Sequence, residues 1–295
     1  MVVVKKRRIG GQDYYYIEHS YREGKTVHKK ELYLGKSLPR NLADVERKFL
    51  FEVYEQKWFK LFDSIKRNFS KEQKTIPPSL KEKEMKSFAI RFTYDSNRIE
   101  GSRLTLRETA NLLEKDIAPK EKPLRDIKEA EAHEKVFNEM LGYGKPLSLQ
   151  TVLYWHKKLF EATKQDIAGK VRQHQVAISG SKFTPPLPSE IQPLLNEFFS
   201  WYGKNRQKLH PIELAALVHL KFVTVHPFAD GNGRISRLMM NFILRKHGFP
   251  MLDIHYENRA GYYTALERSQ LKRNDAVFLQ WFFRRYVKEH KKYIQ

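Results

Sequence analysis

The side chains best suited to phosphate chemistry gather in one short segment that begins at His226. An apolar stretch over residues 214–225 leads to this histidine, and a loop with glycines at positions 231 and 233 follows it. Glycines let the backbone turn and point its amides inward. Because a helical pattern starts directly after the loop, free N–H groups and the helix dipole favour a bound anion there. The segment therefore predicts a site for phosphate groups.

Ionisable side chains in the same segment strengthen this prediction. Arg234 and Arg237 are three residues apart, so they share a helix face, and each guanidinium can bind phosphate oxygens through two hydrogen bonds. Asp230 can hold Mg²⁺, and His226 can accept a proton near neutral pH. Each residue alone is ordinary as a turn, a helix end or a solvated face. Their combination at this spacing indicates phosphoryl-type chemistry, in which positioning and charge stabilisation dominate.

The elements that must position this segment are mostly helical, so the predicted fold class is mainly α. Thr105 with Glu108 resembles a capping box at the start of one helix. Apolar spacing predicts helices over residues 43–69, 80–98, 105–115, 125–142, 148–163, 189–206, 211–225, 232–246 and 257–293, the last with a break near Asn274. One segment interrupts them: residues 169–184, followed by two prolines, are predicted to form a β-hairpin.

The N-terminal part has a different character. Residues 1–36 contain β-rich runs with Gly10 and Gly11 at a turn, which predicts a small antiparallel sheet. We divide the chain into this β meander (1–40), a helical connector (41–78) that ends in a linker at KEQKTIPP, and a larger domain (79–295). The sheet is basic and rich in tyrosine, so nucleic-acid binding is one interpretation. A tyrosine-rich packing face is favoured, because no specific binding motif accompanies the charge.

The composition limits the class of protein. The 295-residue chain carries 55 Lys and Arg against 34 Asp and Glu, a formal charge of +21 that attracts polyanions such as nucleotides. The absence of cysteine excludes disulfides, thiolate metal sites and cysteine nucleophiles. No stretch approaches the roughly 20 apolar residues of a membrane span, and the N-terminal segment lacks a signal peptide's apolar region. We expect a cytoplasmic protein with no membrane partner.

The segment that starts at His226 resembles the signature of the Fic family, His-x-Phe-x-(Asp/Glu)-Gly-Asn-Gly-Arg-x-x-Arg. Its fixed positions fall on His226, Phe228, Asp230, Gly231, Asn232, Gly233, Arg234 and Arg237. The resemblance covers about residues 80–290. It implies a Fic-type helical domain in which His226 is the general base, Asp230 binds Mg²⁺ and Arg237 holds the γ-phosphate of ATP. Asn232, Arg234 and the amides of the two glycines would cradle the α- and β-phosphates.

Other parts of the chain match further features of this family. Phe228 would anchor the loop from within the core. The predicted hairpin at 169–184 resembles the family's flap, which pairs with an extended target segment strand to strand. The flap candidates are Arg172, Val176 and Ile178. Residues 262–266 resemble the helix on the adenine side, and the candidates there are Tyr263, Leu266 and Gln270.

A second motif resembles the family's inhibitory signature, (Ser/Thr)-x-x-x-Glu-(Gly/Asn). It matches Ser96, Glu100 and Gly101, at the end of the predicted helix over about 80–100. A glutamate before a glycine is also common at an ordinary helix terminus. Beside the full catalytic signature, the resemblance implies that the carboxylate of Glu100 pairs with Arg237. Arg237 would then be withheld from the γ-phosphate, and the inhibition would act within one chain.

These observations predict a protein adenylyltransferase that uses ATP and Mg²⁺ and is inhibited by Glu100. Its partner would be an unidentified protein with an accepting Tyr, Thr or Ser hydroxyl, and a homodimer is left open. One alternative keeps the fold but removes AMP, or transfers another nucleotide or phosphate-containing group. An alternative of another class is a nucleic-acid-binding regulator that acts through the basic N-terminal sheet. A P-loop ATPase is disfavoured, because the chain has no G-x-x-x-x-G-K-(S/T) motif.

Overall fold

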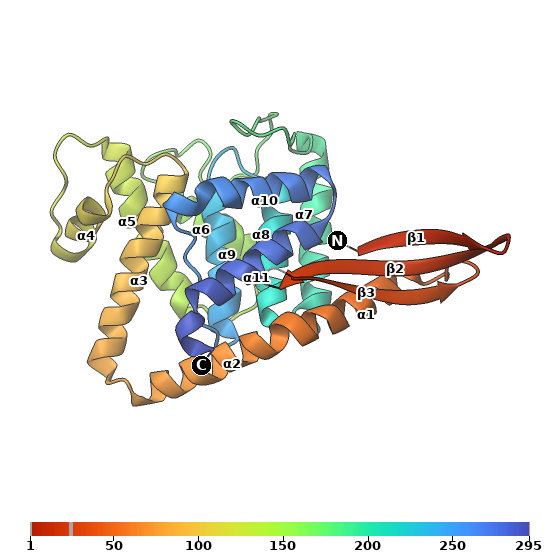
Figure 1. The fold of residues 1–295 in the computed structure, drawn as a ribbon. Helices are drawn as coiled ribbons and strands as arrows, with labels where there is room; N and C mark the ends of the chain where they lie inside the picture. Colours follow the sequence, from red (N-terminus) through yellow and green to blue (C-terminus); the bar gives the residue numbers. More distant parts are fainter. Residues whose placement is uncertain (1, 24–25, 295) are drawn as a thin grey trace. The chain divides into compact units, whose positions relative to one another are not determined.

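The computed structural model describes residues 2–23 and 26–294, which divide into two compact units (Figure 1). One unit extends to Ser64, and the other runs from Ile65 to Tyr293. Among the described residues, strands occur only in the first unit, and helices make up most of the second. The mainly α fold class and the N-terminal sheet are therefore confirmed. The predicted domain limits after residues 40 and 78 remain predictions.

The N-terminal sheet has three antiparallel strands in the order β1 (Val2–Ile9), β2 (Gln12–Glu23) and β3 (Thr26–Gly35). Gly10 and Gly11 both adopt positive φ and form the two-residue turn between the first pair of strands, as the sequence predicts. The buried Ile17 pairs with Val4 on one side and with Leu32 on the other.

Many of the sheet's basic side chains are paired with acidic ones. Lys5 and Lys29 lie 2.7 and 2.6 Å from the carboxylate of Glu18, and Arg7 also contacts it. These contacts hold the pKa of Glu18 well below its usual range, and the largest effect comes from Lys29, followed by Lys5. Because their charges are already balanced, these side chains attract phosphate groups less than the sequence count suggests.

The connector is helical almost without interruption. Helix α1 (Leu42–Tyr54) continues through a π-helical turn (Glu55–Phe59) into α2 (Lys60–Thr75). The predicted linker at KEQKTIPP is therefore wrong for most of its length, since only Ile76 and Pro77 separate α2 from the next helix. The proline pair explains the break, because Pro78 lacks an amide hydrogen and is tolerated only in the first turn of α3.

The second unit consists of successive helices, with a long non-helical connection at residues 161–187. Their bounds are α3 (Pro78–Ile99), α4 (Leu106–Lys115), α5 (Leu124–Gly142), α6 (Leu149–Phe160), α7 (Pro188–Asn205), α8 (Pro211–Val225), α9 (Asn232–Lys246), α10 (Arg259–Leu271) and α11 (Asp275–Glu289), with a 3₁₀ turn, η2 (Tyr256–Asn258), before α10. The capping box of Thr105 and Glu108 is present at the start of α4. In the described part of the chain, no helix is long and apolar enough to cross a membrane.

Helices α8 and α9 form the centre of this unit. Most residues of both are buried, including apolar side chains on every face of α8, which is typical of a helix surrounded by others. Helix α8 packs against α7, α9 and α11, while α9 packs against α3, α5 and α6. The loop between α8 and α9 carries the predicted phosphate site, so the most deeply buried pair of helices positions it.

The predicted β-hairpin at 169–184 is not formed. The segment is extended and turns at Ile178–Ser181, where Gly180 has a φ of 73°, but it contains no strand. An isolated two-stranded ladder is marginal in water. Here side chains hold the two arms instead: Gln175 donates to the carbonyl of Pro185, and Arg172 donates to that of Pro186.

Candidate functional site

The loop between α8 and α9 has the conformation that an anion site needs. Helix α8 ends at His226, which adopts the left-handed conformation with a φ of 52°, uncommon for a residue with a side chain. Gly231 also has a positive φ, of 82°, and α9 begins at the next residue. A Cβ on Gly231 would lie 2.5 Å from the ring of Phe160, so only glycine fits there. The first amides of α9 thereby lie at the end of the loop.

Three buried side chains hold the loop against the core. Phe228 is fully buried and stacks on His156, with ring centroids 3.8 Å apart, as expected for an anchor. Asn232 accepts from the amide of Phe228 at 2.9 Å and donates to its carbonyl at 2.8 Å. Sequence reasoning assigns Asn232 to phosphate, whereas its side chain here holds the loop in shape. His156 completes the brace through a 3.0 Å contact with the Asp230 carbonyl.

His226 is held in one orientation and one protonation state. Its Nδ1 lies 3.3 Å from the carbonyl of Val223, which can only accept, so Nδ1 carries the hydrogen of the neutral ring. The other nitrogen, Nε2, is then an acceptor. Burial lowers the pKa of His226 below its ordinary value, so the ring is neutral near pH 7. This is the state that a general base requires.

Arg237 is buried and fully engaged by the end of α3. It donates to the hydroxyl and the carbonyl of Ser96, each at 2.9 Å, and to Oε1 of Glu100 at 2.7 Å. Its remaining terminal nitrogen lies 3.3 Å from the hydroxyl of Tyr262. Burial alone would lower the pKa of Arg237, but Glu100 outweighs this and raises it. The predicted pairing of Glu100 with Arg237 is thus present in the structure.

Gly233 makes room for this ion pair. A Cβ at this position would overlap Oε1 of Glu100 and lie 2.9 Å from Nη1 of Arg237. Glycine is therefore required at this second position for steric reasons, because a side chain there would push Glu100 away from the guanidinium.

Substituting Gly233 with alanine is expected to lower the free energy of unfolding by about 1–3 kcal/mol, the usual cost of overpacking a closed site. Most of that cost should disappear in the Glu100→Gly background, because the overlapping carboxylate is then absent. Urea denaturation of the two single variants and the double variant measures this coupling. Additive effects of the two substitutions would show that the clash with Glu100 is not the cause.

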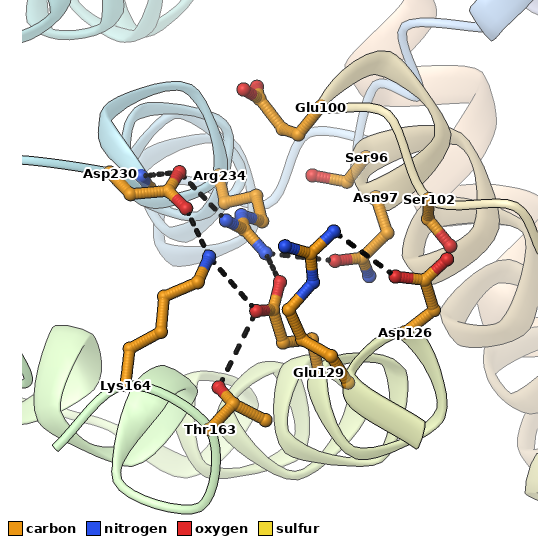
Figure 2. Close-up of polar contacts among 12 residues, drawn as sticks. Ser96, Asn97, Glu100, Ser102, Asp126, Glu129, Thr163, Lys164, Asp230 and Arg234 are labelled. Atoms are coloured by element: carbon orange, nitrogen blue, oxygen red, sulfur yellow. Dashed lines mark hydrogen bonds and ion pairs between the residues drawn. The ribbon is translucent and has the colours of Figure 1, made fainter. Parts of the chain in front are cut away.

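Arg234 and Asp230 belong to a closed ring of alternating charges (Figure 2). Asp230 Oδ1 lies 3.0 Å from Nη2 of Arg234, and Asp230 Oδ2 lies 2.5 Å from the Nζ of Lys164. Glu129 contacts the other end of the Arg234 guanidinium and lies 3.2 Å from Lys164. Burial alone would raise the pKa of Asp230, but Arg234 and Lys164 together lower it to about 2. Asp230 is therefore a carboxylate at any ordinary pH.

Glu129 and Lys164 are site residues that sequence reasoning missed. Glu129 lies in α5, and Lys164 follows α6, so each is more than 60 residues from the loop that it contacts. Neither position carries a local motif. The available signal is the charge of Glu129 on the apolar face of a helix, next to the buried Ala130, since a buried charge requires a partner.

Replacing Glu129 with glutamine is expected to destabilise the second unit by about 3 kcal/mol. The substitution leaves the buried guanidinium of Arg234 without one of its two carboxylates, and breaking a buried pair costs about 3–5 kcal/mol. The lower figure applies because Asp230 still balances part of the charge. Urea denaturation, with the exposed Glu139→Gln on the same helix as a control, measures the loss. Equal stability of the two variants would contradict it.

A cavity of about 630 Å³ opens beside the ion pair and the histidine. The sequence candidates that line it are Glu100, Gly101, Ile178, His226, Gly233, Tyr263, Leu266 and Gln270. Catalytic, inhibitory, adenine-side and flap candidates thus line the same cavity, which is large enough for a nucleotide. Val176 is half-buried and lies outside that lining.

The extended segment is tied to both ends of the cavity. Arg172 is buried and donates to the backbone carbonyls of His226, His174 and Pro186 at 2.7–2.9 Å. At the turn, the hydroxyl of Ser181 and the amide of Lys182 both donate to Glu267 of α10. Arg172 therefore holds the segment in place through backbone carbonyls. Glu267 also positions the segment, and sequence reasoning did not identify it.

Asp230 offers two carboxylate oxygens, and each of them contacts a basic side chain. One of its oxygens faces an ammonium group, so a positive charge already stabilises that position. A small hollow next to it is lined by acidic and amide side chains and also by three basic ones: Asn97, Glu100, Asp126 and Glu129, with Arg125, Lys164 and Arg234 (Figure 2). Carboxylate and amide oxygens are the ligands that Mg²⁺ prefers.

Known proteins of one family are similar to this chain. Residues 146–244 match the model of the Fic/DOC family. The chain is 35% identical over 181 residues to a protein adenylyltransferase Fic of Nematostella vectensis, covering 60% of this chain and 42% of that protein. It is 31% identical over 262 residues to a protein of the same name from Aedes aegypti, covering 87% and 50%. The chain thus spans about half the length of the curated relatives it matches.

Two solved structures resemble the fold. One is a Fic domain-containing signaling protein from Bacteroides thetaiotaomicron, with a TM-score of 0.70 and 25% identity, covering 78% of this chain and 96% of that one. The other is residues 134–508 of Fic-1 from C. elegans, with a TM-score of 0.71 and 25% identity, covering 88% and 79%. The similarity extends beyond the family match to most of the helices.

Proposed function

Since residues 146–244 form a domain of the Fic/DOC family, we propose that the chain transfers AMP from ATP to a side-chain hydroxyl of another protein. The observation that carries the proposal is the position of His226. This neutral imidazole lines a 630 Å³ cavity together with Gly233, at the point where the amides of α9 begin. A base and an anion site therefore face the same space, as nucleotidyl transfer requires.

The chemistry follows from these positions. The triphosphate binds at the start of α9, and the base of the nucleotide occupies the end of the cavity near Tyr263, Leu266 and Gln270. Nε2 of His226 accepts the proton of the target hydroxyl, whose oxygen attacks the α-phosphorus. The bond from that phosphorus to the bridging oxygen breaks, and pyrophosphate leaves. The products are a phosphodiester on the target and an imidazolium, which returns its proton to solvent.

Asp230 is the residue that would hold Mg²⁺, which would neutralise charge on the phosphates when bound. Before the metal binds, Lys164 and Arg234 keep the Asp230 side chain ionised and oriented. Arg234 would therefore contribute to the site mainly by positioning Asp230, and less through direct phosphate contact than its sequence position suggests.

We further propose that Glu100 restrains the activity. Arg237 is the guanidinium that would hold the γ-phosphate, and Ser96 and Glu100 occupy its donors. ATP must therefore compete with a carboxylate for the same buried side chain. The inhibition acts within the chain, because both partners belong to it.

The position of the label in ATP tests the transfer. Chain incubated with Mg²⁺ and ATP labelled at the α-phosphorus should yield labelled protein, either a target from lysate or the chain itself. ATP labelled at the γ-phosphorus should yield none. Label from the γ-position alone would indicate a kinase, and release of labelled AMP without labelled protein would indicate hydrolysis; either result overturns the proposal.

Removal of AMP is a second candidate activity at the same site. Glu100 lines the cavity with His226, so its carboxylate could orient a water toward a bound phosphodiester. The accepting residue of the target is a Tyr, Thr or Ser hydroxyl in either direction. The nucleic-acid alternative has less support, because acidic partners balance several basic side chains of the sheet.

A further inference from the structure

A second cluster of ionisable side chains lies away from the loop after α8. Asp95 is near the end of α3, and Asp253 and His255 lie in the segment between α9 and η2. One ligand atom from each of the three lies within 4.8 Å of the others. Asp95 and Asp253 are 2% and 5% exposed, so two carboxyl groups meet out of water. Such groups require a cation or a proton between them.

The cluster contains acceptors without matching donors. Oδ2 of Asp253 is buried and has no hydrogen-bond partner within the described chain. Oδ1 of Asp95 accepts from the amide of Tyr256 at 2.7 Å, which leaves its Oδ2 facing Nδ1 of His255 at 3.7 Å. One potential ligand atom from each of the three residues therefore lies in the same small region.

His255 is oriented as a metal-binding histidine usually is. Its Nε2 lies 3.0 Å from Oε1 of Glu289, and Glu289 in turn pairs with Arg285. A carboxylate can accept the hydrogen of Nε2, and Nδ1 then faces Oδ2 of Asp95 with a lone pair that a metal ion can use. Metal-binding histidines typically donate their second nitrogen to a carboxylate in this way, which fixes the ring and raises its basicity.

We propose that Asp95, Asp253 and His255 form a binding site for a divalent transition-metal ion of the Zn²⁺ class. Two carboxylates and one imidazole suit such an ion better than Mg²⁺ or Ca²⁺, which prefer oxygen ligands alone. Metal–ligand distances near 2.0–2.1 Å place ligand atoms about 3.3 Å apart, so the ligand atoms, which lie within 4.8 Å of one another, would have to approach by at most about 1.5 Å. His255 is 22% exposed and provides the path from solvent.

The competing explanation is a proton shared by the two carboxyl groups. Burial, followed by the charge of Asp95 and a hydrogen bond between the two carboxyl groups, raises the pKa of Asp253 well above its usual range, and a shared proton would satisfy this arrangement. The nearby Arg91 also carries positive charge toward Asp253. An imidazolium at His255, with one N–H toward Glu289 and the other toward Asp95, is the other arrangement without a metal. It gives Oδ2 of Asp253 no partner, whereas a metal ion would contact all three side chains together.

The metal would fasten two parts of the second unit. Asp95 precedes Ser96, which holds Arg237, and Asp253 and His255 precede α10, which carries Tyr263. A bound ion would therefore fix the end of α3, where Glu100 lies, against the entry to α10. Its effect on inhibition rests on the proposed function, whereas the metal site itself does not.

Metal binding by the Asp230→Asn chain tests the proposal, since that substitution removes the expected Mg²⁺ ligand. After treatment with EDTA, calorimetric titration with Zn²⁺ should show one tight site, and mass spectrometry of the dialysed protein should find one equivalent. Adding Asp253→Asn or His255→Gln should weaken that site at least ten-fold, and Glu289→Gln about ten-fold. The exposed Asp166→Asn is the matched control and should leave it unchanged.

Thermal unfolding supplies a readout that requires no activity. Zn²⁺ should raise the melting temperature of the Asp230→Asn chain, because ligand binding stabilises the folded state, and should not raise it once Asp253→Asn is added. The amide introduced by Asp253→Asn can donate to Asp95, so this variant should fold even if the pair normally shares a proton. Absence of the tight site from Asp230→Asn, or its persistence unchanged after adding Asp253→Asn and His255→Gln, would overturn the proposal.

Discussion

Replacing Glu100 with glycine should raise the rate of AMP transfer by about 100-fold. The substitution removes the carboxylate that lies 2.7 Å from the buried Arg237, and leaving a buried guanidinium without its carboxylate costs about 3 kcal/mol, which a bound phosphate would recover. Each 1.36 kcal/mol corresponds to a factor of ten in rate. With Glu100 absent, the guanidinium is available to the γ-phosphate without competition.

The measurement is incorporation of α-labelled AMP into protein over time. Glu100→Gln keeps the shape of the side chain but not its charge, so it should raise transfer as well. Glu84→Gln, at an exposed position of the same helix, is the matched control and should behave as wild type. Incorporation by Glu100→Gly no greater than by wild type would show that this ion pair does not restrain the enzyme.

Replacing His226 with alanine should lower transfer by about 10²–10⁴-fold, the usual contribution of a positioned general base. Nucleotide binding should change little, because the amides of α9 and the arginines remain. The expectation depends on Nδ1 being held by the Val223 carbonyl, so that Nε2 alone faces the cavity.

This variant is best measured in the Glu100→Gly background, where the starting rate is high. Nucleotide affinity from calorimetry separates a catalytic loss from a binding loss. The exposed His174→Ala in the neighbouring extended segment is the control, since it removes an imidazole but keeps the carbonyl that Arg172 uses. Undiminished labelling by the His226→Ala variant would remove the histidine from its role.

The parts of the site that sequence predicts are those built from contiguous residues. The loop at 226–237 combines turn-forming glycines, an imidazole and guanidinia within one segment, and local geometry determines where they point. Glu100 could also be predicted, through its motif, although it lies 137 residues from Arg237. The helices follow from apolar spacing, and their observed ends lie close to those expected except at α2, which continues to Thr75 through most of the predicted linker.

The parts that sequence does not predict depend on tertiary contacts. Glu129 and Lys164 approach Asp230 and Arg234 from elements far along the chain, and no local pattern marks them. The extended segment at 169–184 has the composition of a hairpin, but Arg172 and Glu267 fix it through side-chain contacts instead of a ladder. Propensity describes a residue's local preference, which such contacts override.

The roles of Asn232 and Arg234 also depend on tertiary contacts that the motif does not reveal. Asn232 lies in the anion loop, yet both ends of its amide bind the backbone of Phe228. Arg234 lies beside it, yet its guanidinium is buried between Glu129 and Asp230. A motif identifies which residues belong to the site, while the burial of each side chain determines whether it contacts the ligand or supports a neighbour.

The intact mass of the Glu100→Gly chain after incubation with ATP and Mg²⁺ tests the account most directly. We expect the mass to rise by one AMP unit, on the chain itself or on an added target, and we expect no rise when His226 is also replaced by alanine. An unchanged mass of both chain and targets, or a gain of a single phosphate, would contradict transfer of AMP at this site.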